Sequence, residues 1–159
     1  MRPILIIGLG NPAMGDEGIG WHVSNRLAAD PRLPEDAEVL WAGVDLLAFA
    51  DRMTGRKQVT LLDAMLDTSE PGTVRVFEDD FTELENRQPS VHQLSAVEAI
   101  QLLRIVDPSL CAVRFKLIAI SIESAEMQSE LSPALAARIP ALVDRVLTPA
   151  LLAVRPGPG

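Results

Sequence analysis

The chain has 159 residues, of which 48% are hydrophobic, enough to build the packed core of one domain of ordinary size. Its 22 acidic residues outnumber its 14 basic residues, giving a formal net charge of −8. This acidic balance disfavours binding to nucleic acid or to an anionic membrane surface, so a protein or small-molecule partner is expected.

The N-terminal segment, the apolar segments and the single cysteine give an expectation about the location of the protein in the cell. Residues 1–8 lack the long apolar region and the cleavage site of a signal peptide, and no segment has the roughly 20 apolar residues that would span a bilayer. Cys111 has no partner for an intramolecular disulfide, and its apolar neighbours predict that it is buried. We expect a cytoplasmic protein, with one domain over residues 1–155 and a loose tail over residues 156–159.

The first half of the chain alternates apolar runs with helical patterns. Residues 4–9 predict a strand buried on both faces, and residues 21–28 predict an amphipathic helix that ends before Pro31. A second strand is expected over residues 38–42. A helix then follows over residues 46–53, with Asp45 as its N-cap and Gly55 near its C-terminal end. A third strand covers residues 58–62 and ends in Asp63.

The second half continues this alternation. Residues 73–77 predict a half-exposed strand, and an antiparallel strand at the edge of the sheet fits this pattern. A helix over residues 94–104 has two candidate starts, because Ser90 with Gln93 and Ser95 with Glu98 both fit a capping box. The last strand covers residues 114–121.

A C-terminal helix is expected to begin at Ser132 and Pro133, to kink at Pro140 and to continue to about Val154. The whole pattern predicts an α/β fold, a three-layer α/β/α sandwich with a twisted, mostly parallel sheet of about five strands. In such sheets, ligands bind beyond the carboxyl ends of the strands.

The glycine-rich turn after the first strand indicates a cation site rather than a nucleotide site. Gly8 and Gly10 begin like a dinucleotide fingerprint, but Ala13 stands where the third glycine is expected. Asp16 and Glu17 would also face the pyrophosphate. We therefore expect no nucleotide cofactor, and we expect the glycines to leave clearance for an incoming ligand.

Glu17, Asp63 and His92 follow or precede elements whose ends meet at one sheet edge. Two carboxylates and one imidazole can bind a divalent transition metal and leave coordination positions open. From spacing alone the metal signal is weak and ordinary roles stay open: a helix-dipole acid for Glu17, a cap or turn acid for Asp63 and an exposed loop histidine for His92. Asp16 is a candidate base, a hydrogen-bond acceptor or a loop cap, and His22 is expected to be structural.

Five segments carry a family resemblance: residues 8–11 (Gly-Leu-Gly-Asn), 15–20 (Gly-Asp-Glu-Gly-Ile-Gly), 62–64 (Leu-Asp-Ala), 90–94 (Ser-Val-His-Gln-Leu) and 131–140 (Leu-Ser-Pro through Ile-Pro). In this order they resemble the hydrogenase maturation endopeptidases. The resemblance implies a phosphorylase/hydrolase-like α/β fold. It also implies an enzyme that removes a short C-terminal extension from the precursor of a nickel-iron hydrogenase large subunit after nickel insertion.

By the same resemblance, Glu17, Asp63 and His92 are the catalytic and nickel-contacting residues, and the substrate supplies the nickel. The metal either polarises the scissile carbonyl or activates water, or it serves only as a recognition element, which we favour. Many relatives have a Gly-Thr-rich turn near a substrate-selecting acid, where this chain has residues 42–45 (Ala-Gly-Val-Asp). Asp45 is therefore either a shifted equivalent of that acid or simply the N-cap.

Two alternatives differ in chemistry. Residues 8–12 (Gly-Leu-Gly-Asn-Pro) also resemble the opening of peptidyl-tRNA hydrolase, an esterase, although that resemblance stops at Asp16 and Glu17. A nickel-binding maturation factor without catalytic activity is the second alternative.

Overall fold

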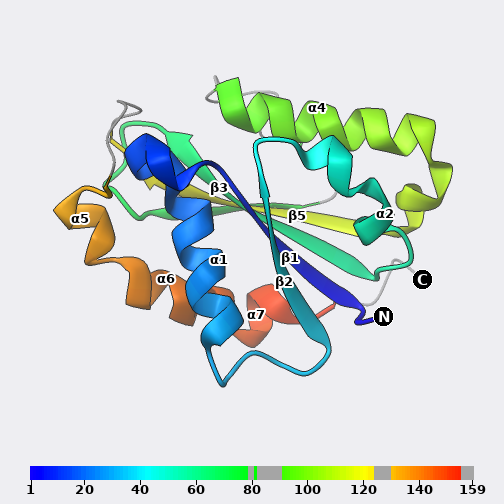
Figure 1. The fold of residues 1–159 in the computed structure, drawn as a ribbon, viewed down its shortest axis with the longest axis horizontal. Coiled ribbons are helices and arrows are strands. Elements are labelled where there is room, and N and C mark those ends of the chain that lie inside the picture. Colours follow the sequence, from blue (N-terminus) through cyan, green and yellow to red (C-terminus); the bar gives the residue numbers. More distant parts are fainter. Residues whose placement is uncertain (79–80, 82–90, 124–129, 155–159) are drawn as a thin grey trace.

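The computed structural model describes residues 1–78, 81, 91–123 and 130–154, with only the backbone of residues 91–95. Its centre is a single five-stranded sheet in the order β2-β1-β3-β5-β4 (Figure 1). The strands are β1 (Ile4–Leu9), β2 (Ala37–Gly43), β3 (Gln58–Leu66), β4 (Val74–Glu78) and β5 (Arg114–Ile122). All neighbouring pairs are parallel except β4 with β5, which are antiparallel. The expected mostly parallel sheet with an antiparallel edge is confirmed.

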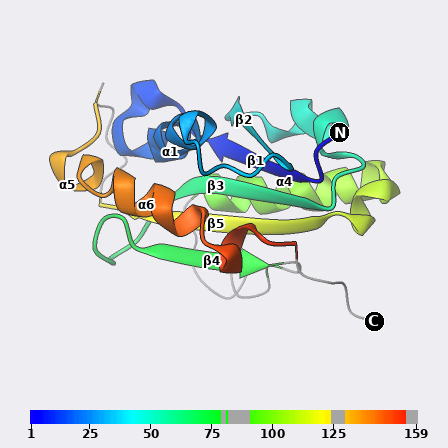
Figure 2. The same cartoon turned by 90° about the horizontal axis from the view of Figure 1, so that it is seen from below.

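Helices cover both faces of the sheet, as Figures 1 and 2 show from two sides. One face carries η2 (Leu46–Phe49), α2 (Ala50–Met53), α4 (Val91–Val106) and η3 (Pro108–Ala112). The other face carries α1 (Ile19–Ala29), α5 (Pro133–Ala136), α6 (Ile139–Val146) and α7 (Pro149–Leu152). The predicted three-layer α/β/α sandwich is therefore confirmed.

Strand alternation divides the core into two clusters. In β1, Leu5 and Ile7 belong to the cluster under α2 and α4, whereas Ile4 and Ile6 belong to the cluster under α1 and α6. Successive side chains of a strand point to opposite faces, so an unbroken apolar run is needed where both faces are covered.

Two helices that were predicted to be continuous are divided into shorter segments in the structure. The expected helix over residues 46–53 is the 3-10 turn η2 followed by the short helix α2. The expected C-terminal helix is three short helices, because Pro133, Pro140 and Pro149 each stand in the first turn of a new one. Proline lacks the N–H that an interior turn needs but fits a first turn, so Pro140 stands in the first turn of α6, which begins at Ile139, rather than kinking a longer helix.

Of the two candidate helix starts, the one at Ser95 is excluded, because α4 begins at Val91 and already includes Ser95. A start at Ser90 agrees with this bound, although Ser90 itself lies outside the described residues. One local prediction was wrong. Cys111 is exposed rather than buried, because it lies in η3, where Leu110 takes the buried position.

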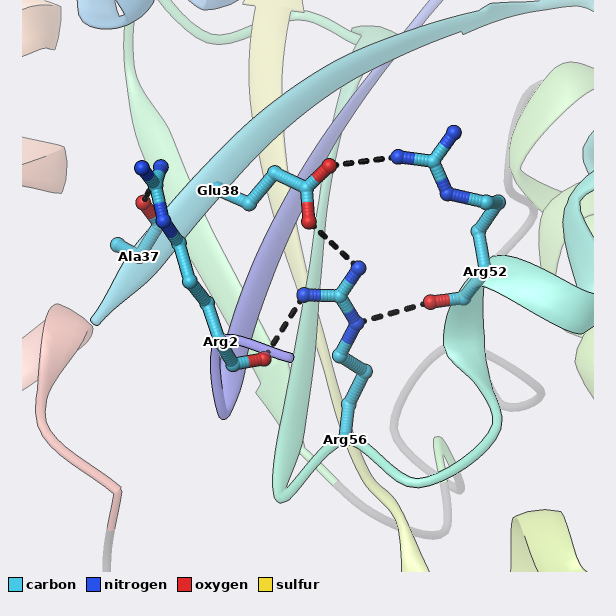
Figure 3. A network of polar contacts seen from close by, with 5 residues as sticks. All are labelled: Arg2, Ala37, Glu38, Arg52 and Arg56. Atoms are coloured by element: carbon cyan, nitrogen blue, oxygen red, sulfur yellow. Dashed lines mark hydrogen bonds and ion pairs between the residues drawn. The ribbon is translucent and has the colours of Figure 1, made fainter. Parts of the chain in front are cut away.

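A buried arginine secures the end of the sheet at which β1 begins (Figure 3). The side chain of Arg56 is only 3% exposed and donates to Glu38 Oε2 at 2.6 Å. It also donates to the backbone carbonyls of Arg2 and Arg52, at 2.8 and 2.9 Å. Arg52 donates to the other oxygen of Glu38 at 2.6 Å. This network joins the chain before β1 to β2 and to the end of α2.

Within the described part of the chain, no helix is long and apolar enough to cross a membrane.

Candidate functional site

Asp63 lies inside β3, which is longer than expected and continues to Leu66. The register pairs Gly8 of β1 with Leu62 of β3, so Asp63 is level with the end of β1. It is 4% exposed, and its Oδ1 accepts the backbone N–H of Ala64 at 2.8 Å. The expectation that Asp63 ends its strand or caps a turn was wrong, but its position at the edge where β1 ends was correct.

Glu17 is delivered by the loop between β1 and α1. This loop forms the 3-10 segment η1 (Pro12–Gly18), which Asn11 caps by accepting the N–H of Ala13 at 2.9 Å. The segment kinks at Gly15, where φ is 60°, and α1 begins at Ile19. Glu17 therefore sits in the loop just before the helix.

Glu17 and Asp63 line the same cavity, which has a volume of about 480 Å³. Its walls come from the β1 end and η1, the turn after β2, β3 and α4. The lining residues are Leu9, Gly10, Asn11, Met14, Glu17, Gly43, Val44, Asp45, Leu46, Leu47, Asp63, Ala64, Ala96 and Ala99. Three acidic residues in an otherwise largely apolar wall favour a cationic or metal-bearing ligand, because their negative charges attract a cation and carboxylate oxygens can bind a metal ion.

Asp45 is the acid in this wall whose role the sequence left undecided. It occupies the N-cap position of η2, but its side chain makes no capping hydrogen bond. Asp45 is an exposed residue that lines the cavity together with Glu17 and Asp63. The sequence feature that could have indicated this position is the turn at residues 42–45. It comes at the end of β2, as the Glu17 loop comes at the end of β1, and parallel strands end at the same edge of the sheet.

His92 lies in the first turn of α4, four residues before Ala96, which lines the cavity. Its side chain is outside the described residues, so the structure places Glu17 and Asp63 together but does not place the third predicted ligand. Among the side chains that are described, no three His, Cys, Asp or Glu residues form a group that could hold a metal ion.

Asp16 does not line the cavity. The residue is 8% exposed, and its carboxylate accepts the backbone N–H of Ser132 at 2.7 Å, which makes Asp16 a hydrogen-bond acceptor between distant segments. The sequence had no signal for this partner, since residues 16 and 132 belong to different ends of the chain.

His22 lies on α1 beside Trp21, with the two ring centroids 4.9 Å apart in an edge contact. Burial lowers the pKa of His22, and the positive charge of Arg26 lowers it further. A neutral, packed imidazole agrees with the structural role expected for it.

The last residues of β2 hold the beginning of the Glu17 loop. Gly10 donates its N–H to the carbonyl of Gly43 at 2.8 Å, and Trp41 donates its indole N–H to the carbonyl of Gly10 at 2.8 Å. Gly10 has a φ of 100°, and a Cβ there would overlap the backbone carbonyl oxygen of Glu17. The expectation that glycine leaves clearance for a ligand was wrong at Gly10, where it allows the loop to pack against itself.

Comparisons with known proteins agree with this architecture. A model of the hydrogenase maturation protease family matches residues 21–149. Hydrogenase 2 maturation protease of Escherichia coli K12 is 27% identical over 146 residues, covering 91% of this chain and 88% of that protein. Protein FrxA of Pyrococcus furiosus is 28% identical over 137 residues, covering 85% of this chain and 96% of its own.

Solved structures give the same result. The nickel-iron hydrogenase maturation protease HybD from Thermococcus kodakarensis superimposes with a TM-score of 0.76 at 28% identity, covering 92% of this chain and 97% of that one. HybD from E. coli also has a TM-score of 0.76 at 28% identity. The family match over most of the chain, together with these structures, shows that the chain belongs to the hydrogenase maturation proteases, enzymes that hydrolyse a peptide bond.

Proposed function

We propose that this protein removes the C-terminal extension of a nickel-iron hydrogenase large-subunit precursor after nickel has been inserted. Nickel held by the precursor is the recognition element, and Glu17, Asp63 and His92 are the residues that contact it. The observation that carries this proposal is the placement of Glu17 and Asp63 in the wall of one cavity. A cytoplasmic location remains a prediction from the sequence.

The two carboxylates suit a metal that arrives with its substrate. Asp63 is buried on a central strand, and the Ala64 N–H occupies one of its oxygens, which limits how the carboxylate can turn. Glu17 comes from a loop and approaches the same space from another element. Oxygen ligands from two separate elements can add to a metal whose other ligands the precursor provides.

The position of the metal would decide where cleavage occurs. A precursor anchored through its nickel presents one particular peptide bond to the cavity, so the metal orients the substrate. Asp45 adds a third acidic residue to the wall, and we propose that it contacts the peptide beside the metal. Nickel also acts as a checkpoint under this proposal, because a precursor without it lacks the group that the acids bind.

Membership of this protease family removes the support for a peptidyl-tRNA hydrolase. An experiment distinguishes the proposed protease from a nickel-binding maturation factor without catalytic activity. Purified enzyme is mixed with a nickel-loaded precursor and, separately, with the same precursor without nickel, and the C-terminal mass of each is measured. Loss of the extension only from the nickel-loaded form is expected. Cleavage of both forms contradicts nickel recognition, and cleavage of neither contradicts the proposed function.

The residue assignment has its own test with single-residue variants. Glu17→Gln, Asp63→Asn and His92→Ala are each expected to lower kcat/KM by about a hundredfold or more, since the first two replace a charged carboxylate by a weaker, neutral amide ligand and the third removes the imidazole. Glu35→Gln is the matched control, because Glu35 is an exposed acid in the turn between α1 and β2. Wild-type cleavage by any of the three site variants would remove that residue from the site.

A further inference from the structure

Asp16 and Glu17 are neighbours in sequence, but only Glu17 lines the cavity. The Asp16 carboxylate is buried, and its Oδ1 accepts the backbone N–H of Ser132 at 2.7 Å. Ser132 stands directly before α5, and Figures 1 and 2 both show α5 near the segment before α1. A single side chain therefore joins the loop that carries Glu17 to the C-terminal part of the chain.

The loop needs such an anchor because its own backbone is irregular at this point. Met14 and Gly15 have non-helical dihedral angles, so the helical hydrogen-bond pattern is interrupted just before Asp16. After the interruption, the carbonyl of Asp16 accepts the N–H of Ile19. Asp16 is thus held through its side chain by Ser132 and through its backbone carbonyl by Ile19 at the start of α1, and Glu17 is the residue that follows it.

From this geometry we propose that Asp16 is a positioning residue for the hydrolysis: by accepting the Ser132 N–H, it fixes the backbone that presents Glu17 to the cavity. The inference rests on the proposed function. It assigns no proton transfer to Asp16, in contrast to a role as general base. The two roles differ in what they require, because positioning needs only an acceptor oxygen, whereas a base needs an ionisable group.

Three variants separate these roles. Asp16→Asn keeps an acceptor oxygen but cannot act as a base, and Asp16→Ala keeps neither property. Ser132→Pro removes the N–H donor from the other side. The φ of −58° and ψ of 146° at Ser132 are values that proline adopts. We expect Asp16→Asn to cleave the nickel-loaded precursor within about threefold of the wild-type kcat/KM, and Asp16→Ala and Ser132→Pro each to lose about tenfold.

The Asp16→Ala/Ser132→Pro double variant should be no slower than either single variant, because all three lack the same hydrogen bond. Asp107→Ala is the matched control. Asp107 Oδ1 also accepts a backbone N–H, from Ser109 at 3.1 Å, but caps η3, none of whose residues lines the cavity. This control is expected to lose stability without losing kcat/KM. An Asn variant as slow as the Ala variant, or fully additive losses in the double variant, would overturn the positioning role.

Amide hydrogen exchange at Ile19 tests the anchoring role without a substrate, because the Ile19 N–H is bonded to the carbonyl of Asp16. Exchange at this amide should accelerate in Asp16→Ala and Ser132→Pro but not in Asp16→Asn, whether or not the precursor is a substrate. Wild-type enzyme that fails to cleave the precursor, with this exchange pattern intact, counts against the proposed function alone. Unchanged exchange in all variants, with cleavage by the wild type, overturns the anchoring role alone.

Discussion

Gly10 packs directly against the backbone of Glu17, so that a methyl group at position 10 would overlap the Glu17 carbonyl oxygen. Gly10→Ala is therefore expected to displace the loop and to lower kcat/KM at least about tenfold, because Glu17 would leave its place in the cavity wall. The positive φ of Gly10 adds a stability loss of about 2 kcal/mol. Precursor cleavage and urea unfolding measure the two effects.

Gly43→Ala provides the control for this prediction. Gly43 also has a positive φ and lines the same cavity, but a Cβ there would meet only the Trp41 ring, at 3.9 Å. It should share the stability loss of Gly10→Ala but keep most of the activity. Equal activity losses in both variants would show that backbone strain, rather than displacement of Glu17, is responsible.

The sequence predicted those features that depend on local pattern. The apolar run at residues 4–9 correctly gave a central buried strand, and parallel strands bring their carboxyl ends together, which placed Asp63 beside the loop of Glu17. Contacts between segments that are far apart in the sequence could not be predicted from local pattern. Nothing near Asp16 indicates Ser132 as its partner, and nothing near Asp45 shows that its side chain makes no capping hydrogen bond.

Cys111 illustrates the limit of arguing from apolar neighbours, and its exposure gives a direct prediction. The thiol lies on η3 and should react with a water-soluble disulfide reagent at one equivalent per chain without denaturant. The reaction is followed spectrophotometrically, with Cys111→Ser as the unreactive control. A thiol that reacts only after denaturation would contradict the exposed position.

The Glu38 and Arg56 pair predicts a large stability effect away from the cavity. The side chain of Arg56 is 3% exposed, and among the contacts described for it Glu38 is the only carboxylate. Glu38→Ala removes this carboxylate. We expect a loss of about 3 kcal/mol in the free energy of unfolding, because a buried guanidinium loses its counter-charge. Arg52→Ala is the control: Arg52 contacts the same carboxylate but is 46% exposed, so about 0.5 kcal/mol is expected. Similar losses in both variants would contradict the importance of burial.

The same pair predicts how stability depends on pH. The hydrogen bond from Arg56 holds the pKa of Glu38 below its ordinary value, so the unfolded chain takes up the proton more readily than the folded one. The stabilisation from Glu38 is therefore complete above the unfolded pKa of about 4.3 and is lost as the pH falls from there through the folded pKa. In Glu38→Gln this titration is absent, while an amide oxygen can still accept from Arg56. Between pH 7 and pH 3, urea unfolding should show a smaller loss of stability in Glu38→Gln than in the wild type, and parallel pH profiles would exclude Glu38 as a contributor to acid denaturation.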